Sequence, residues 1–564
     1  MNIVVCCKSV PGLVTNPKVS ADGKALEYQS QLLAINECDE YALEEALVLK
    51  KAHGGQITVL SMGGIKSQDV LYYGLAKGAD KAVRVDCESQ DAQVSSRVLA
   101  AALPKLEFDL VLTGTQARDT LGGQVGIAAA SRLGLPFAYA VVGVEVPSAG
   151  SVKVTKELGG GRHAEVELSL PALLCIQTGI QPLTFVPPAR RIRARHQGLP
   201  NSRGTSAGAL APSRADHRQC PGNRRCAVRK NPGEPIMTGD ILVLVEHADG
   251  KVDSVTYQLL NVGRQLANQL KVQLLALAVG HQLENMSTAL QGRGMDKIML
   301  LDDAALALAA GEVQAQAIAQ VARQFEPRLI LLGYSLLGME LAPAIAVQLG
   351  TNALTNCVGL KFDGGAIIAT KPVFDSTLHA EFVLDDSAPA VIGLQKGSFA
   401  PIEATAAQAA VESIKVDVAS IPSRSKILAI AEEPTGDVDI TKAEIVVSVG
   451  RGIGTADKIP LIAELADALG GVLACSRPVV DVGWLPRERQ VGASGRTVTP
   501  KIYIACGISG AIQHLIGMRE ANRIIAINKD TDAPIFGVAH LGVVGDLFEI
   551  VPALTKAAKE AKTG

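Results

Sequence analysis

Short apolar runs alternate with segments of helical periodicity along most of the chain. In the N-terminal part, NIVVCC (2–7), QITVLSM (56–62) and DLVLTG (109–114) are separated by segments such as 39–52 and 95–103, whose apolar positions recur every three or four residues. Buried parallel strands read as continuous apolar runs, and a helix usually connects one parallel strand to the next. The pattern predicts repeated βαβ units, and therefore an α/β fold with parallel sheets.

The same pattern occurs a second time and then a third. Between about 238 and 420 the runs ILVLVE, QLLALAV, KIMLLD and LILLG repeat the order of the first block, and HAE at 163–165 recurs at 379–381. We expect these two blocks to be duplicated domains that pack as a pseudo-symmetric pair. A third block from about 426 contains EIVVSVG, KIYIAC and RIIAIN. The sequence thus predicts three parallel-sheet α/β domains, two related by duplication and the third Rossmann-like.

The stretch 189–236 differs from the blocks on either side. It holds ten arginines and one lysine against two acidic residues, with Gly, Pro and Ser throughout and no apolar period. Such a segment cannot bury enough apolar surface to order itself, which predicts a solvated linker. A nucleic-acid-binding arm would be expected to carry interleaved aromatic residues, and this segment has none. The expected domains are 1–195, 237–423 and 424–564, with the linker at 196–236.

Composition narrows the class of protein further. The 564 residues are 48% apolar and 3% aromatic with a net charge of −2, which favours α/β cores and gives no bulk attraction to nucleic acid or an anionic membrane. No apolar run approaches bilayer-spanning length and the N-terminus enters a strand at once, so we expect a soluble, cytoplasmic protein. The ten cysteines form no C-x-x-C pair and have no histidine at metal-ligand spacing. Most are expected to be buried thiols, without a metal.

One turn carries the clearest sign of chemistry. After the apolar run 501–505 come Gly507, Ser509 and Gly510, and a helical segment opens at Ala511. A strand that leads through a small-residue turn into a helix presents free backbone N–H groups and the positive end of the helix dipole, which suit a phosphate or pyrophosphate. The turn lacks the G-x-G-x-x-G spacing, and small residues also allow close packing of a helix on a sheet. The pattern alone leaves both interpretations open.

Longer blocks around this turn resemble a known family. SRPVVDVGWLP, RQVGASGRTVTPKIYIACGISGAIQHL and AINKDTDAPIF are similar, in this order, to the FAD-binding domain of the alpha subunit of electron-transfer flavoproteins. In the first block, NIVVCCKSVPG, LLAINECDEYALEEALVLK and DLVLTGTQARDTLGGQVGIAAASRLGLP resemble the beta subunit. The chain therefore resembles a fusion of the beta subunit, residues 1 to about 195, with the alpha subunit, residues 237–564, of a protein usually made as a heterodimer.

The resemblance implies that the third domain binds FAD. It places Arg477 over the isoalloxazine, His514 near its pyrimidine edge and the Ser494 hydroxyl near N5. A reduced flavin gains negative charge, so cationic or donor groups there raise its potential. Ala493 stands where the family often has Gln, which predicts an altered potential rather than lost binding. The implied FAD residues are Arg451, Ser476, Arg477, Gln490, Val491, Gly492, Ala493, Ser494, Ser509, Gly510, Ala511, Ile512, Gln513, His514, Asn528, Asp546 and Leu547.

The residue types agree with such a site. Ser509 and Gly510, with the first N–H groups of the following helix, can hold a pyrophosphate. Asn528 and Asp546 lie at the ends of a strand and of a Gly-rich turn, where they can contact ribose or adenine. Ligands of open α/β sheets lie beyond the carboxyl ends of the parallel strands, so this placement is the expected one.

The resemblance also implies that the first domain holds AMP. The loop 114–126 again joins a strand to a helix, and bifurcating members of the family carry a second FAD there, with a loop resembling D-G-D-T-A-Q. This chain has DTLGGQ at 119–124, which favours AMP and leaves FAD open; from the residues alone, an ordinary surface loop is also compatible. The implied AMP residues are Cys6, Asn36, Asp39, Met62, Gly114, Gln116, Asp119, Thr120, Gly122, Gly123, Gln124, Val125 and Gly126.

Partners and function follow from the same resemblance. LLCIQTGIQPLTFVPPAR (173–190) occupies the position of the loop by which the family docks acyl-CoA dehydrogenases, with Ile180, Leu183 and Phe185 as apolar anchors. Burial of these side chains against a neighbouring domain is the alternative. The implied function is an electron carrier rather than a substrate-converting enzyme. It would take electrons from acyl-CoA dehydrogenases or related flavin dehydrogenases, as in beta-oxidation, to the membrane-bound electron-transfer flavoprotein quinone oxidoreductase.

Three other functions are alternatives to the electron carrier. Within the family, the alternative is a bifurcating module whose second FAD oxidises NADH. A nucleotide-dependent ligase or dehydrogenase would be expected to show a P-loop, a nucleophile elbow, a metal constellation or G-x-G-x-x-G, and the sequence shows none of them. An adenine-nucleotide sensor would leave Arg477, Ser494 and His514 unexplained.

Overall fold

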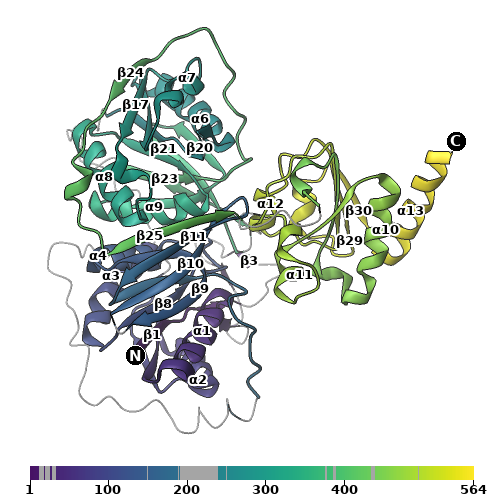
Figure 1. Ribbon diagram of the computed structural model, residues 1–564, viewed down its shortest axis with the longest axis horizontal. Helices are drawn as coiled ribbons and strands as arrows, with labels where there is room; N and C mark the ends of the chain where they lie inside the picture. Colours follow the sequence, from purple (N-terminus) through teal and green to yellow (C-terminus); the bar gives the residue numbers. More distant parts are fainter. Residues whose placement is uncertain are drawn as a thin grey trace.

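Three α/β units follow one another along the part of the chain that the structure describes (Figure 1). The computed structural model describes residues 1–11, 18–19, 26–27, 33–89, 91–148, 150–187, 190, 239–248, 250–374, 376, 378–384, 389–432, 438–492 and 495–563. None of the helices in these ranges combines the length and the apolar character needed to cross a lipid bilayer.

The N-terminal unit is a parallel sheet extended by an antiparallel hairpin. Its parallel strands lie in the order β9-β12-β8-β1-β6-β7, and β10 and β11 extend the sheet beyond β9. The elements are β1 Asn2–Cys6, α1 Glu37–His53, β6 Gln56–Met62, α2 Gln68–Lys77, β7 Lys81–Val85, α3 Ala92–Ala102, β8 Leu110–Gly114, α4 Val125–Leu133, β9 Phe137–Ser148, β10 Ser151–Gly159, β11 Arg162–Ser169 and β12 Ala172–Ile176, with the short pairs β2 Ser9–Pro11 to β5 Leu33–Ile35 and β3 Lys18–Val19 to β4 Leu26–Glu27.

The second unit repeats this topology. Its parallel strands lie in the order β19-β23-β18-β13-β16-β17, which matches the first unit strand for strand, and β24 adds to the edge. The elements are β13 Ile241–Leu244, α6 Ser254–Leu270, β16 Leu274–Gly280, α7 Glu284–Leu290, β17 Lys297–Asp302, α8 Gly311–Phe325, β18 Leu329–Gly333, α9 Leu336–Gln348, β19 Ala353–Cys357, β20 Gly359–Asp363, β21 Ala366–Val373, β22 Leu378–Val383, β23 Ala390–Leu394 and β24 Ala410–Ser413, with the short pair β14 His247–Ala248 to β15 Lys251–Val252. The predicted duplication is therefore visible in the strand order.

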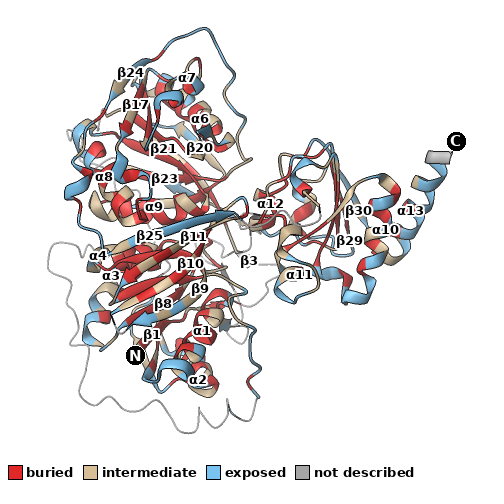
Figure 2. Ribbon diagram, viewed as in Figure 1, coloured by how far each residue is buried: buried red, intermediate tan, exposed pale blue. Residues whose placement is uncertain are grey.

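The two related units share one apolar core. Ile127 and Ala130 of α4 belong to the same buried cluster as Met339 and Ile345 of α9. Figure 2 shows buried residues along the strands of both sheets and along α9, which lies at the boundary between the units. Apolar surface that is buried in this way holds the two units together without help from the segment that joins them in sequence.

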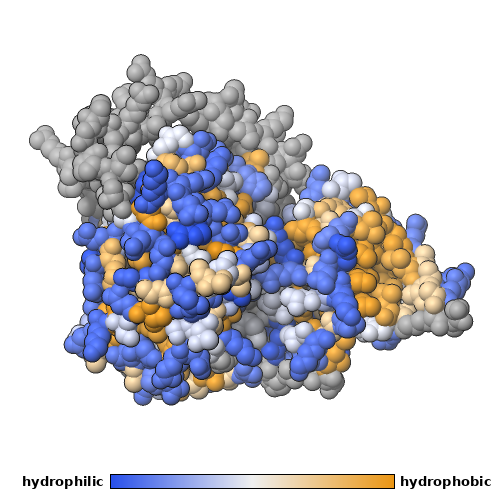
Figure 3. All heavy atoms as spheres, turned by 90° about the horizontal axis from the view of Figure 1, so that it is seen from above, coloured by the Kyte–Doolittle hydropathy of each residue, from blue (hydrophilic) through white to orange (hydrophobic). Residues whose placement is uncertain are grey.

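The C-terminal unit is a separate parallel sheet with strand order β27-β26-β28-β29-β30. Its elements are β26 Ile445–Val449, α10 Ile459–Leu469, β27 Val472–Cys475, α11 Arg477–Asp481, β28 Ile502–Cys506, α12 Ile512–Ile516, β29 Ile524–Asn528, β30 Leu541–Val544 and α13 Leu547–Thr563. This 2-1-3-4-5 order is one of the doubly wound arrangements that bind nucleotides at the switch point of the sheet. Seen from above, apolar side chains gather on this unit (Figure 3).

A strand from the predicted FAD-binding range completes the first sheet instead. β25, Ser425–Glu432, pairs antiparallel with β11 from Ser425 opposite Leu168 to Glu432 opposite Arg162. The boundary that we place at 424 therefore needs correction, because the backbone of β25 finds its hydrogen-bond partners in the N-terminal unit. The first strand of the C-terminal sheet along the chain is β26. The sequence around residues 425–432 does not indicate which of the two sheets β25 joins. The boundaries that we expect at 195–196 and 236–237 lie outside the described residues.

These contacts predict that cleavage between the first two units will not separate them. Trypsin acting on the arginine-rich stretch 196–236 should give two fragments that elute together in gel filtration, because the shared core and the β11–β25 pairing remain intact. Substituting Ala429 in β25 by Pro removes one N–H from this strand and should weaken the association of the cut fragments. Rapid separation of the unsubstituted fragments, or resistance of 196–236 to trypsin, would contradict the linker interpretation.

Candidate functional site

The carboxyl ends of the strands in the C-terminal sheet bring together the predicted FAD residues. These side chains lie at or just beyond successive strand ends: Arg451 after β26, Ser476 after β27, Ser509 after β28, Asn528 at the end of β29 and Asp546 after β30. Gln490, Val491 and Gly492 lie beside them, since the N–H of Val491 donates to the carbonyl of Cys475 at 2.9 Å. Ala493 and Ser494 lie outside the described residues, as does the side chain of Ile512.

Two glycine-containing loops, which follow β26 and β28, meet at the switch point between these strands. The N–H of Gly450 donates to the carbonyl of Cys506 at 2.9 Å, and that of Gly452 to the carbonyl of Gly507 at 3.1 Å. A Cβ on Gly450 would collide with the carbonyl of Gly507, so the approach requires glycine. Ser509 is exposed beside this crossing, and α12 begins at Ile512 with Ala511 as its N-cap. The glycines thus let the two loops form a tight cradle whose backbone leads through Ser509 and Gly510 into α12, which fits a pyrophosphate.

Asn528 and Asp546 hold the rim of this cradle. The Asn528 side-chain amide donates to the carbonyl of Ile508 at 2.9 Å, and its oxygen accepts from the N–H of Asp530 at 3.0 Å. The Asp546 carboxylate accepts from the N–H of Phe548 at 2.8 Å, which caps the first turn of α13. Gln513 lies in α12, and Leu547 is buried at the start of α13. These contacts fix the loops; direct contact of Asn528 and Asp546 with ribose or adenine stays a prediction.

His514 lies inside the unit rather than at its surface. It is 6% exposed, and its Nε2 is 2.9 Å from the hydroxyl of Tyr503. Nδ1 is buried without a well-formed hydrogen bond in the described part of the chain, although the backbone of Val491 lies nearby. Burial lowers the pKa of His514 to about 4, against the opposing effect of the Val491 backbone. At neutral pH this imidazole is uncharged, so it can act as a donor but not as a cation.

Arg477 lies where the C-terminal unit meets the N-terminal unit. Its Nη1 is 3.2 Å from Oε1 of Glu157, which is 1% exposed, and its Nη2 donates to the carbonyl of Thr178. Nε lies 3.5 Å from Asp481. Arg487 contacts the same Glu157 carboxylate. The charge of Arg477 is therefore balanced by carboxylates in this arrangement, and its contact with the isoalloxazine stays a prediction.

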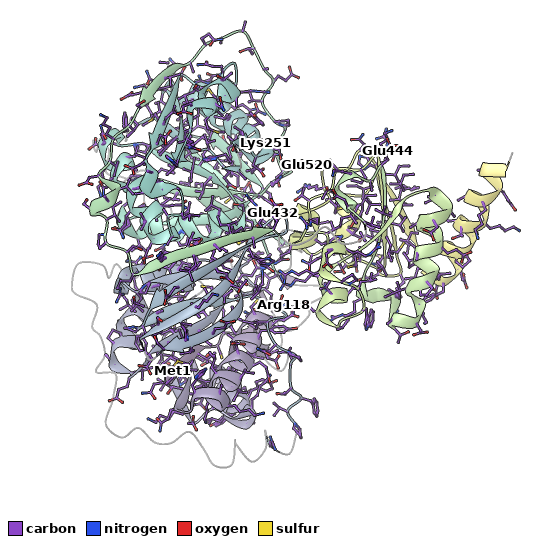
Figure 4. All side chains as sticks on the ribbon, viewed as in Figure 1. Met1, Arg118, Lys251, Glu432, Glu444 and Glu520 are labelled. Carbon is purple, nitrogen blue, oxygen red and sulfur yellow. The ribbon has the colours of Figure 1, made fainter. Side chains whose placement is uncertain are left out.

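The C-terminal unit also touches the second unit. The Glu520 carboxylate accepts from the Ser254 hydroxyl and from the Gln258 amide, both at 3.2 Å. Figure 4 shows Glu520 at the edge of the C-terminal unit that faces the second unit. Polar contacts of this kind are weaker than the apolar core that joins the first two units.

A cavity of about 1070 Å³ lies in the N-terminal unit at its boundary with the second unit. Most of the predicted AMP residues line it: Cys6, Asp39, Met62, Gly114, Gln116, Thr120, Gly122, Gly123, Gln124, Val125 and Gly126. The turn requires glycine at Gly123, whose φ is +63° and where a Cβ would lie 2.9 Å from the hydroxyl of Tyr139. The first turn of α4 opens into the cavity, so its free N–H groups face any ligand there.

Two of the predicted AMP residues do not line this cavity. Asn36 donates from its amide to the carbonyl of Gln116 at 2.8 Å and so holds the loop, while Asp119 pairs with Lys8 at 2.7 Å. Asp39 does reach the cavity, but its carboxylate accepts from the N–H groups of Lys8 and Gly114 at 2.8 and 2.9 Å. Burial raises the pKa of Asp39 to about 6 despite these hydrogen bonds.

Sequence reasoning missed the part of the cavity that the second unit contributes. Thr351, Asn352 and Lys371 line it together with Lys8 of the first unit. The Thr-Lys pair that the duplication places at 155–156 and 370–371 was a signal that could have singled out Lys371. No group of three or more His, Cys, Asp or Glu side chains with the arrangement of a metal site occurs among the described residues.

The predicted docking residues divide between the core and the surface. Ile180 is partly buried and packs against the N-terminal core. Leu183 is 39% exposed and Phe185 81% exposed, so the neighbouring units leave these two side chains accessible. Phe185 is the most exposed of the large apolar side chains in the described ranges.

Comparison with known families agrees with this architecture. The model of the electron transfer flavoprotein domain matches residues 26–198 and again 241–419, which are the two units of equal strand order. The model of the electron transfer flavoprotein FAD-binding domain matches residues 439–519, which contain the glycine cradle.

Individual relatives are similar over somewhat more than half of the chain. The electron transfer flavoprotein subunit alpha of Thermoanaerobacterium thermosaccharolyticum is 41% identical over 325 residues, covering 57% of this chain and 98% of that protein. Protein FixB of Bradyrhizobium diazoefficiens is 34% identical, covering 56% and 88%. The lactate dehydrogenase (NAD(+),ferredoxin) subunit LctC of Acetobacterium woodii is 33% identical, covering 56% and 75%. Since the domain model matches more than half of the residues, the chain belongs to the electron transfer flavoprotein family.

Proposed function

We propose that this chain is a beta–alpha fusion that carries electrons through one FAD held by the C-terminal unit. The observation that carries the proposal is the convergence of Arg451, Ser476, Ser509, Asn528 and Asp546 at the strand ends around the glycine cradle. FAD, when bound, supplies the redox chemistry. The chain itself would hold the pyrophosphate on the backbone of the cradle and place His514 as an uncharged donor.

AMP is the proposed occupant of the cavity in the N-terminal unit. The glycine turn at 122–123 and the first turn of α4 supply backbone N–H groups to a phosphate, and a bound nucleotide would stabilise the boundary between the first two units. One observation favours a second candidate. A volume of about 1070 Å³ is at the upper end for small-molecule pockets, so a second FAD would also find room, as the bifurcating alternative requires.

Counting the cofactors of the purified full-length chain distinguishes these two functions. We expect one FAD and one AMP per chain after acid release and chromatography, with no oxidation of NADH. Two FAD per chain together with NADH oxidation would support the bifurcating module instead. Absence of flavin, in protein that is folded and was supplied with FAD, would contradict both proposals.

The uncharged state of His514 gives a prediction for acid stability. Its pKa of about 4 in the folded protein lies below the unfolded value of 6.5, so the unfolded chain binds the proton more readily. Stability should therefore fall as the pH drops from 6.5 towards 4, by about 3 kcal/mol for this group. Urea unfolding of wild type and His514→Gln at pH 7.5 and pH 4.5 measures the difference, which should shrink at the lower pH.

His53→Gln, at an exposed position of α1, is the matched control for this measurement. It should leave the pH dependence of unfolding as in the wild type. An equal pH dependence in His514→Gln and wild type would show that folding does not lower the pKa of His514.

For the partner, we propose that flavin dehydrogenases of the acyl-CoA dehydrogenase type dock at Phe185 and Leu183, and that the electrons leave to a membrane quinone oxidoreductase. An apolar side chain as exposed as Phe185 is a typical anchor of a protein interface. Phe185→Ala should raise the KM for the carrier about thirtyfold with a dehydrogenase that reduces the wild type, because hot-spot truncations cost about 2 kcal/mol.

Val411→Ala is the control for docking, since Val411 is 50% exposed on β24 at the edge of the second unit. It should leave the KM unchanged, and both variants should keep their flavin. If Phe185→Ala and Val411→Ala behave alike, the dehydrogenase docks elsewhere.

A further inference from the structure

The duplication places a buried lysine at the same position in each of the first two units. Lys156 lies in β10 within VTKELGGGRHAE, and Lys371 lies in β21 within ATKPVFDSTLHAE. Lys156 is 7% exposed and Lys371 5%. Each side chain reaches across the boundary into the other unit, because Lys156 contacts Glu340 of α9 and the ammonium of Lys371 lies 3.3 Å from the Cβ position of Gly122.

The two lysines differ in what balances their charge. The ammonium of Lys156 pairs with the buried carboxylate of Glu340. The position that corresponds to Glu340 in the first unit is Gln124, since both residues stand at the same distance before the Leu-Gly pairs 133–134 and 349–350. Gln124 is neutral, and its side-chain amide shares a hydrogen bond of 2.8 Å with the hydroxyl of Thr355. The first unit therefore lacks, at Gln124, the negative charge that the second unit has at Glu340.

No carboxylate in the described ranges forms an ion pair with Lys371. Asp119 acts on Lys371 electrostatically, but its carboxylate is 2.7 Å from Lys8 and forms its ion pair there. Burial, together with Lys8, lowers the pKa of Lys371 to about 8, while Cys357 and Asp119 oppose the shift. A buried cation without a partner is costly, and ionisable groups with strongly shifted pKa values cluster at functional sites.

The position that lacks the negative charge is at the edge of the cavity. Lys371 and Gln124 both line it, beside the glycine turn and the first turn of α4. An ammonium and the free N–H groups of a helix start, aimed into the same space, form a site for a phosphate group. In the second unit the carboxylate of Glu340 fills the equivalent role, so the corresponding position there has no need of an anion.

We propose that Lys371 binds the phosphate of the nucleotide in the N-terminal unit. The phosphate then balances the charge of Lys371 as Glu340 balances the charge of Lys156, and the site is selective for phosphorylated nucleotides. The inference rests on the proposed nucleotide site, to which it adds a residue from the second unit. A nucleotide held in this way contacts both units at once.

The test compares AMP with adenosine on the nucleotide-stripped full-length chain by isothermal titration. Lys371→Gln should weaken AMP binding about tenfold to a hundredfold, as expected for loss of a charge-assisted hydrogen bond, and leave adenosine binding unchanged. Lys371→Arg should keep most of the preference for AMP. Lys361→Gln, a 53% exposed lysine on the neighbouring β20, is the matched control and should behave as the wild type.

A second variant tests the missing charge directly. Gln124→Glu introduces into the first unit a carboxylate equivalent to Glu340 of the second. This carboxylate should pair with Lys371, and so raise the melting temperature of the nucleotide-free protein and reduce its affinity for AMP. An AMP-to-adenosine preference that stays unchanged in Lys371→Gln would overturn the role of Lys371 while leaving the nucleotide site in place. If the wild type binds neither compound, the proposed nucleotide itself is wrong and the inference fails with it.

Discussion

The apolar contact between α4 and α9 is the interaction on which the rest of this structure depends. These helices place side chains of both related units in one buried cluster, so neither unit completes its core alone. The cavity lies at the same boundary and takes its walls from both units. The C-terminal unit in turn rests on a surface that exists only when the pair is assembled, since it contacts Glu157 on one side and Ser254 on the other.

The duplicated pair is symmetric in topology and asymmetric in charge. Glu157 follows Lys156 in the first unit, whereas Pro372 follows Lys371 in the second. A buried carboxylate must be compensated, and Arg477 and Arg487 of the C-terminal unit provide that compensation at Glu157. Proline offers neither charge nor an N–H donor at the equivalent place. Among the described residues, Glu157 therefore gives the third unit a charged contact on the first unit that the second unit does not offer at the equivalent position.

Much of this architecture could be predicted from the sequence because the signals are local. The run 502–506 is apolar and contains two isoleucines, and it forms β28; the repeated HAE motif correctly indicated two units of the same strand order. The gathering of Ser476, Ser509 and Asn528 followed from a general rule, namely that the carboxyl ends of parallel strands share one edge of the sheet.

What could not be predicted depends on contacts between distant parts of the chain. The sequence places the start of the third block at about 426 but does not indicate that residues 425–432 pair with β11, because the pairing is set by tertiary packing. The burial of His514 against Tyr503, which makes the imidazole uncharged, has no signature in the sequence around it. Lys371 likewise looks like an ordinary strand residue until the second unit is seen to border the cavity of the first.

Because β25 lies far along the chain, the first sheet can be completed only late in the synthesis of this protein. The N-terminal unit leaves the ribosome first, yet the edge of its sheet at β11 stays open until residues 425–432 have been made. At ordinary rates of translation this delay is on the order of tens of seconds. An open, hydrogen-bonding strand edge is a template for pairing with other chains, so nascent molecules on one messenger are exposed to each other during this interval. Protection by chaperones should therefore matter most while the N-terminal unit still lacks both α9, which completes its shared core, and β25, which completes its sheet.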